Sequence, residues 1–121
     1  MEPQDVPEAV ERARRLLNEV IRLSAGCPQT IRDGSIERAL LDLSRSLRVV
    51  EEALGPRDVV RRPFTGLSTE AELLGGLAMA LRLRMIQLGR TNVSGVEDFI
   101  RRLEDLLRRA SVQLGVRAEQ Q

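Results

Sequence analysis

Apolar residues recur every three or four positions through four stretches of this chain, and this helical spacing is the feature that most limits its fold. The stretches run over residues 5–26, 34–56, 69–89 and 94–115. Residues suited to capping the first free N–H groups of a helix stand near each start: Asp5, Asp33 or Ser35, Thr69 and Ser94. A glycine stands at or next to the end of each stretch, as is typical of helix ends. Since no useful length of sequence alternates as a strand does, an all-α fold is predicted.

The length of the chain limits how these helices are assembled. Four helices of about 20 residues, each about 30 Å long, fit one domain of 121 residues. Short connections after the first and third helices favour antiparallel neighbours. We therefore expect residues 1–121 to form a single antiparallel four-helix bundle made of two helical hairpins. The connection over residues 56–67 joins the hairpins and has room for a short extra helix.

The third predicted helix differs from the other three. In GLAMALRLRMIQLGR, residues 76–90, and in the leucines just before it, apolar side chains cover most of a helix's circumference. Three neighbours in a small bundle cover only part of such a surface, and each bare CH₂ forgoes about 0.8 kcal/mol. We therefore expect another polypeptide to cover the rest, in a homo-oligomer or a larger complex. The predicted interface residues are Leu77, Ala80, Leu81, Leu83 and Met85.

Two adjacent glycines, Gly75 and Gly76, interrupt the same helix. Each costs about 1 kcal/mol relative to alanine in a helix interior. The pair indicates either the close approach of another backbone or a kink.

Arginine supplies all 19 basic residues, and lysine, histidine, tyrosine and tryptophan are absent. Biased codon usage in a GC-rich or thermophilic genome explains this most simply. Selection for guanidinium groups that bind carboxylates or phosphates is the alternative. The net charge of +1 gives no general electrostatic footprint for nucleic acid.

The basic part of the chain lies within residues 61–90, where five arginines face only two acids. These arginines are the candidate contacts for phosphate or another anion: Arg61, Arg62, Arg82, Arg84 and Arg90. The first two stand beside Phe64, and an arginine pair with a ring can clasp a phosphate and stack on a base. A solvated loop with Phe64 in the core is the alternative.

Arg82 and Arg84 are two positions apart, hence about 200° apart around a helix, so they cannot serve the same surface. Each is a candidate for anion binding. Alternatively, each forms a salt bridge with an acid of a neighbouring helix, such as Glu51 or Glu104, or extends its charged end to solvent.

Catalytic groups are scarce. Without histidine the chain lacks the commonest general base and metal ligand. The single cysteine, Cys27, is predicted to be a small buried residue and not a nucleophile. Acids alternate with arginines, as in VEDFIRRLEDLLRR, which is typical of surface ion pairs on a helix. We predict a non-enzymatic protein without cofactor or metal. An arginine-lined pocket that acts on a dianionic small molecule, as chorismate mutases do, is the enzymatic alternative.

Three features bear on location. The segment MEPQDVPEAVE is acidic and lacks the apolar run of a signal peptide. No uncharged apolar stretch reaches the roughly 18 residues that a membrane span needs. A lone cysteine cannot form an internal disulfide, which fits a reducing compartment. These features predict a cytoplasmic protein without membrane association.

The stretch CPQTIRDGSIERALLDL, residues 27–43, resembles an early segment of the small all-helical subunit of type III CRISPR RNA-guided effector complexes. In that family a proline and aliphatic residues lead through an Asn-Gly-Leu turn into a helix rich in alanine and leucine. The chain departs from this pattern at Asp33, where the family has asparagine, and at Ser35, where it has leucine. The later aromatic-rich part of the family has no counterpart. The matching positions are Pro28, Ile31, Gly34, Ala39, Leu40 and Leu43.

This resemblance implies a non-catalytic subunit that stacks along a guide–target duplex and contacts its backbone through arginine. Three hypotheses therefore stand. The favoured one is a non-catalytic helical subunit that self-associates or docks into a larger complex through its third helix. The second narrows it to the small subunit of an RNA-guided ribonucleoprotein, and the third is the arginine-pocket enzyme.

Overall fold

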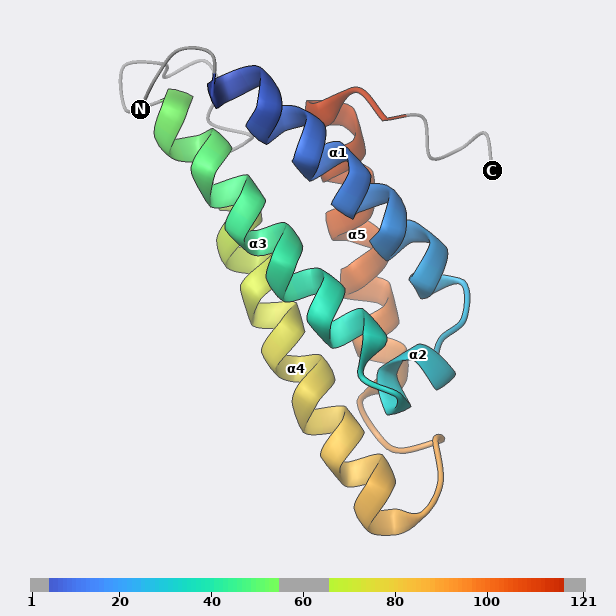
Figure 1. Ribbon diagram of the computed structural model, residues 1–121. Coiled ribbons are helices and arrows are strands. Elements are labelled where there is room, and N and C mark those ends of the chain that lie inside the picture. Colours follow the sequence, from blue (N-terminus) through green and yellow to red (C-terminus); the bar gives the residue numbers. More distant parts are fainter. Residues whose placement is uncertain (1–4, 55–65, 117–121) are drawn as a thin grey trace.

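The computed structural model describes residues 5–54 and 66–116, and the regular secondary structure within these ranges is entirely helical (Figure 1). The all-α prediction is confirmed. The described helices are α1 (Asp5–Ser24), α2 (Gln29–Arg32), α3 (Ser35–Leu54), α4 (Leu67–Leu88) and α5 (Val96–Leu114). The sequence analysis missed α2, whose four residues are too few to show a helical period. The extra helix considered for the 56–67 connection falls mainly on residues 56–65, which lie outside the described ranges.

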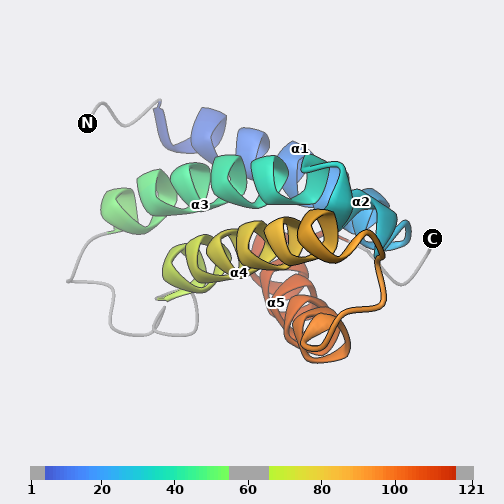
Figure 2. The same ribbon diagram turned by 90° about the horizontal axis from the view of Figure 1, so that it is seen from below.

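The four long helices run in alternating directions along the chain (Figure 1). α3 lies between α1 and α4 and packs on both. α5 lies behind them and contacts α1 and α4. Seen from below, α4 lies between α3 and α5, with α2 at one end of α3 and α4 (Figure 2). α4, the third long helix, therefore has neighbours on two of its sides.

The core is formed by one apolar stripe from each long helix. In α3, the apolar stripe residues from Ile36 to Val50 are almost fully buried. In α5 the stripe continues from Val96 to Leu114, with Phe99 packed at its start. Burying a large aliphatic or aromatic side chain is worth about 1.5–3 kcal/mol, so these stripes hold the helices together.

The starts of the helices depend on tertiary contacts as much as on local sequence. Asp33 caps α3, because its Oδ1 accepts a hydrogen bond from the backbone N–H of Ser35 at 2.8 Å. The predicted cap at Thr69 is wrong, since α4 begins at Leu67. The backbone N–H and the hydroxyl of Ser68 instead donate to the Glu51 carboxylate of α3, at 3.0 and 2.7 Å.

The ends of α4 and α5 follow the sequence closely. A glycine with positive φ stops each helix as predicted, at Gly89 (69°) and Gly115 (75°). The predicted cap of α5 at Ser94 is wrong, because Gly95 precedes the helix without a side-chain hydrogen bond. Nε of Arg14 in α1 donates to the carbonyl oxygen of Leu114 at 2.6 Å, which ties α1 to the end of α5. Within the described ranges, no helix has the length and apolar character to cross a membrane.

Candidate protein-interaction surface

One side of α4 carries large apolar side chains that the described part of the chain leaves exposed. Leu73, Met79, Leu83 and Ile86 have exposed fractions between 42% and 55%, and the smaller Gly76 and Ala80 lie exposed among them. These residues recur at helical spacing, so they share one side of the helix. We call the surface formed by Leu73, Gly76, Met79, Ala80, Leu83 and Ile86 the outer face of α4. Leu88, 52% exposed, lies at the end of the helix beside it.

The opposite side of α4 is already used in the core. Leu74, Ala78, Leu81 and Met85 are buried there against the neighbouring helices. α4 therefore has two apolar sides, and the described helices cover one. Within residues 5–54 and 66–116, the expected apolar surplus on this helix is present.

The predicted interface residues divide between these two sides. Ala80 and Leu83 lie on the outer face, and Leu77 is half-buried at its edge. Assigning Leu81 and Met85 to the interface was wrong, because both are buried in the core of the same chain. Four outer-face residues were not among the predicted interface positions: Leu73, Gly76, Met79 and Ile86. Both sides repeat at the same spacing, so the spacing alone does not tell which one faces the core.

The two glycines of α4 have different surroundings. A Cβ placed on Gly75 would lie 2.7 Å from Cδ2 and 3.0 Å from Cγ of Leu41 in α3, so this glycine permits the close approach of α3. A Cβ on Gly76 would meet nothing within 4 Å. The tightest contact of the Gly75 Cβ is with a side chain, and the nearest backbone atom, the carbonyl oxygen of Glu37, would lie 3.7 Å from that Cβ. Gly76 forms a shallow gap in the outer face.

The two central arginines of α4 point to different neighbours, as their spacing requires. Nε of Arg82 donates to Oε1 of Glu37 in α3 at 2.9 Å, and the side chains are 28% and 16% exposed. Nη1 of Arg84 donates to the carbonyl oxygen of Ser94 at 2.9 Å and approaches its hydroxyl at 3.3 Å. Neither bonds to the acids named as examples, and Glu51 instead accepts from Ser68.

The five candidate anion contacts therefore do not gather on one surface in the described part of the chain. Arg82 and Arg84 are directed apart, and Arg90 is exposed beyond the end of α4. Arg61 and Arg62 lie outside the described residues.

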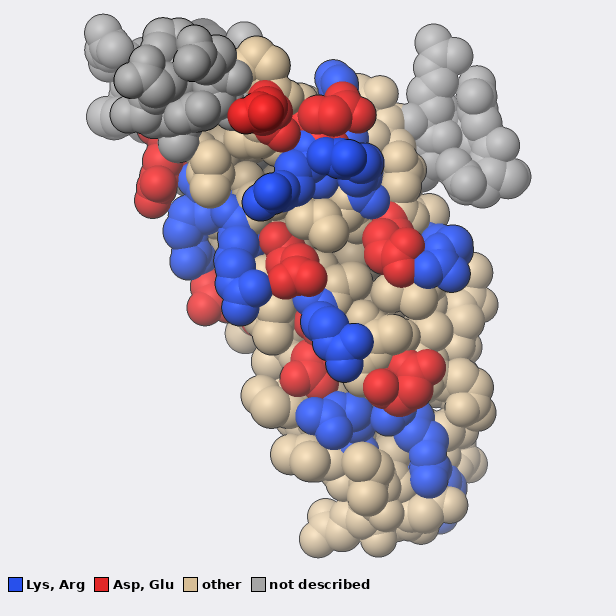
Figure 3. Space-filling model, viewed as in Figure 1, with Lys and Arg blue, Asp and Glu red and all other residues tan. Residues whose placement is uncertain are grey.

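Charged groups border the outer face of α4 at its two ends. Glu72 lies at the N-terminal end, where Oε1 accepts a hydrogen bond from Nη2 of Arg48 at 2.8 Å, and its side chain is still 55% exposed. Arg84 and Arg90 lie toward the C-terminal end. In the view of Figure 3, charged side chains extend over the upper and middle parts of the molecule, and the lowest tip is largely uncharged.

A shallow groove extends the outer face of α4 toward α5. Ala80 belongs to both the groove and the outer face, so the two surfaces are continuous. The start of α5 forms the far wall of the groove. Its lining residues are Leu77, Ala80, Leu81, Arg84, Ser94, Gly95, Asp98, Phe99 and Arg102.

A second groove lies between α1 and α3, and it bears on the enzymatic alternative. Its arginines, Arg12, Arg15 and Arg45, are interleaved with the carboxylates of Glu8 and Glu11. Three arginines and two carboxylates leave this lining one net positive charge. An adjoining groove shares the three arginines and adds Asp42. Acidic groups accompany the arginines in both grooves, and the enzymatic alternative stays a prediction.

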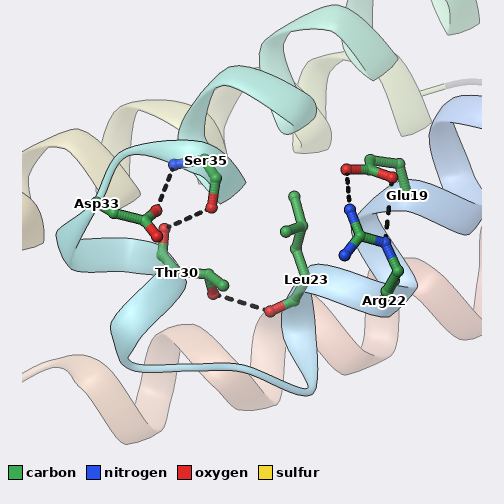
Figure 4. A network of polar contacts seen from close by, with 6 residues as sticks. All are labelled: Glu19, Arg22, Leu23, Thr30, Asp33 and Ser35. Atoms are coloured by element: carbon green, nitrogen blue, oxygen red, sulfur yellow. Dashed lines mark hydrogen bonds and ion pairs between the residues drawn. The ribbon is translucent and has the colours of Figure 1, made fainter.

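The surroundings of Cys27 disfavour a reactive thiol. Burial raises the pKa of the Cys27 thiol, although a contact with the Thr30 hydroxyl at 3.5 Å opposes this. The Thr30 hydroxyl also donates to the carbonyl oxygen of Leu23 at 2.8 Å, and the Ser35 hydroxyl donates to the carbonyl oxygen of Thr30 (Figure 4). This network ties α1, α2 and α3 together and is structural. Among the described residues, no three His, Cys, Asp or Glu side chains are grouped to hold a metal.

No protein-family model, curated protein or solved structure matches this chain. The resemblance of residues 27–43 to the CRISPR small subunit therefore stays a prediction.

Proposed function

We propose that this protein is a non-catalytic interaction subunit that binds another polypeptide through the outer face of α4. One observation carries the proposal: large, half-exposed apolar side chains lie in a row on a helix whose other apolar side is already buried. Single exposed apolar residues are ordinary on protein surfaces. A contiguous row over about 20 Å of helix is typical of an interaction site.

The energetics favour a reversible complex. Burying the exposed half of one of these side chains is worth roughly 1 kcal/mol, so the outer face supplies about 4–5 kcal/mol and a matching partner surface a similar amount. Association itself costs about 4–15 kcal/mol in lost freedom of motion. At the lower end of that cost, about 4–6 kcal/mol remains, so we expect a dissociation constant between about a millimolar and tens of micromolar, not a permanent assembly.

The surroundings of the outer face resemble the rim of a protein interface. Such interfaces have an apolar centre and a polar edge. Here the ion pair of Glu72 with Arg48 lies at one end, and Arg84 lies along the other. A partner would exclude water from the apolar centre and leave these charges at the solvent boundary.

The geometry favours a polypeptide over nucleic acid as the partner. A phosphate-binding surface needs guanidinium groups that can turn toward the ligand. Arg82 is held by Glu37 and Arg84 by Ser94, on opposite flanks of α4. The apolar outer face between them offers a phosphate backbone no charge.

Site-specific photocrosslinking in the native host tests the proposal. A photoreactive amino acid replaces Leu83 on the outer face or, as the matched control, Val112, which is 72% exposed on α5. We expect a covalent adduct of defined mass to a polypeptide from position 83 and none from position 112. The proposal is overturned if position 83 gives no polypeptide adduct, or the same adducts as position 112.

A further inference from the structure

We propose that the outer face of α4 pairs with the same face of a second copy of this chain, with the two helices antiparallel. This inference rests on the proposed interaction function and specifies its partner. Because a symmetric pair uses one surface twice, each residue acts at two places in the interface. The argument depends on how size and charge are distributed along the face.

The midpoint of the outer face lies between Met79 and Ala80. A small residue on one side of this midpoint corresponds to a large residue equally far on the other side. Gly76 and Leu83 both lie near the middle line of the face, and they stand equally far before and after this midpoint. In an antiparallel pair, Leu83 of each copy therefore lies level with Gly76 of the other. Leu83 is 55% exposed, and the position above Gly76 is open. The protruding side chain of one copy thus meets the gap of the other.

A parallel pair lacks this fit. It sets Leu83 level with Leu83 and Gly76 level with Gly76, so two large side chains collide while two gaps stay unfilled. Ala80, the other small residue near the midpoint, allows the helices to approach closely in the antiparallel arrangement.

Charge favours the same orientation at the C-terminal end of the face. Arg84 and Arg90 lie toward that end, whereas Glu72 at the N-terminal end already pairs with Arg48 of the same chain. Parallel pairing sets the arginines of the two copies beside one another, and such contacts disfavour a wrong orientation. Antiparallel pairing separates these arginines and brings them near the Glu72–Arg48 pair of the other copy.

Gly76→Gln tests the pairing in the purified full-length chain. The position is open in the monomer, and glutamine favours the helix more than glycine does, so the fold is kept. By sedimentation equilibrium, we expect the wild type to be a monomer–dimer mixture and the variant to dimerise at least about tenfold more weakly. Val112→Gln on α5 is the matched control, with dimerisation unchanged. Thermal unfolding followed by circular dichroism verifies that both variants fold.

Two outcomes overturn the pairing. One is a wild type that stays monomeric up to the millimolar range, and the other is a Gly76→Gln variant that dimerises as the wild type does. If position 83 nevertheless gives photocrosslinks to a different polypeptide, the proposed interaction function stands and only self-pairing fails.

Cysteine crosslinking tests the orientation. Glu72 and Gln87 are exposed and equally far from the midpoint, so antiparallel pairing sets them level with each other. Two variants, Glu72→Cys and Gln87→Cys, are each made with Cys27→Ala and mixed in equal amounts with a short bismaleimide. We expect mixed dimers that join position 72 to position 87. Mainly 72–72 and 87–87 products would overturn the antiparallel arrangement.

Discussion

α4 and α5 are neighbouring helices of similar length, 22 and 19 residues, yet they use their apolar residues differently. α5 buries one stripe and covers its outer side with ion pairs, such as Asp98 with Arg101 and Asp105 with Arg108. α4 buries one stripe and presents a second to solvent. α5 thus needs no more than its own chain. α4 has apolar surface left over for a partner.

The largest losses of stability are expected from substitutions on the buried sides of α4 and α5, not on the outer face of α4. Leu74→Ala in α4 and Leu103→Ala in α5 each remove a fully buried side chain and leave a cavity, so each should lower the free energy of unfolding by about 2–5 kcal/mol. Leu83→Ala should change it by less than about 0.5 kcal/mol in the monomer. Urea denaturation at low protein concentration measures all three. An equal cost for Leu83→Ala would mean that the two sides of α4 are not distinct.

Losses of stability of intermediate size are expected when ion pairs of α4 and α5 are removed. Arg82→Ala removes the bond from α4 to Glu37 of α3 and leaves a mostly buried carboxylate without its partner, which should cost about 1–2 kcal/mol. Arg101→Ala removes a pair on α5 whose side chains are 74% and 65% exposed, and it should cost less than about 0.5 kcal/mol. Denaturant titrations at low and high salt measure the difference. Equal costs would show that the bond between Arg82 and Glu37 adds nothing to the packing of α4 on α3.

The sequence predicted the helical class and the closing glycines because these depend on local geometry. Only a residue such as Gly89 takes a positive φ without strain, and that requirement is visible without tertiary structure. The start of α4 was mistaken because Glu51 of α3, distant in sequence, bonds Ser68 and the helix begins before Thr69. Long-range partners of this kind leave no local signal.

The sequence predicted an exposed apolar surface on this helix, but it identified only some of the residues that form it. An apolar surplus on this helix follows from counting side chains around its axis. Which side turns inward depends on α3, and the contact of Leu41 with Gly75 marks that side. With two equally spaced apolar rows, the sequence alone did not separate Leu81, which is buried, from Leu83, which is exposed.

The smallest losses of stability are expected from substitutions at the starts of helices. α3, α4 and α5 each follow a glycine with positive φ. The Asp33 carboxylate accepts from the start of α3 and Glu51 of α3 accepts from the start of α4, whereas Gly95 before α5 makes no side-chain cap bond. Asp33→Ala should therefore lower the free energy of unfolding by about 0.5–1 kcal/mol at neutral pH. Ser94→Ala, at the start of α5, is the matched control and should have little effect. Denaturant titration of the wild type and both variants compares the two starts directly.

The pH dependence of that difference tests its cause. Hydrogen bonds from Ser35 hold the pKa of the Asp33 carboxyl below its ordinary value of 3.8. A carboxylate whose pKa is lowered by folding stabilises the native state above its unfolded pKa, and it loses this contribution as the pH falls through the folded pKa. The wild type should therefore exceed Asp33→Ala in stability fully at pH 7, and progressively less below about pH 4. A difference that stays constant into strong acid would show that the charge of Asp33 adds nothing, and that the start of α3 resembles that of α5.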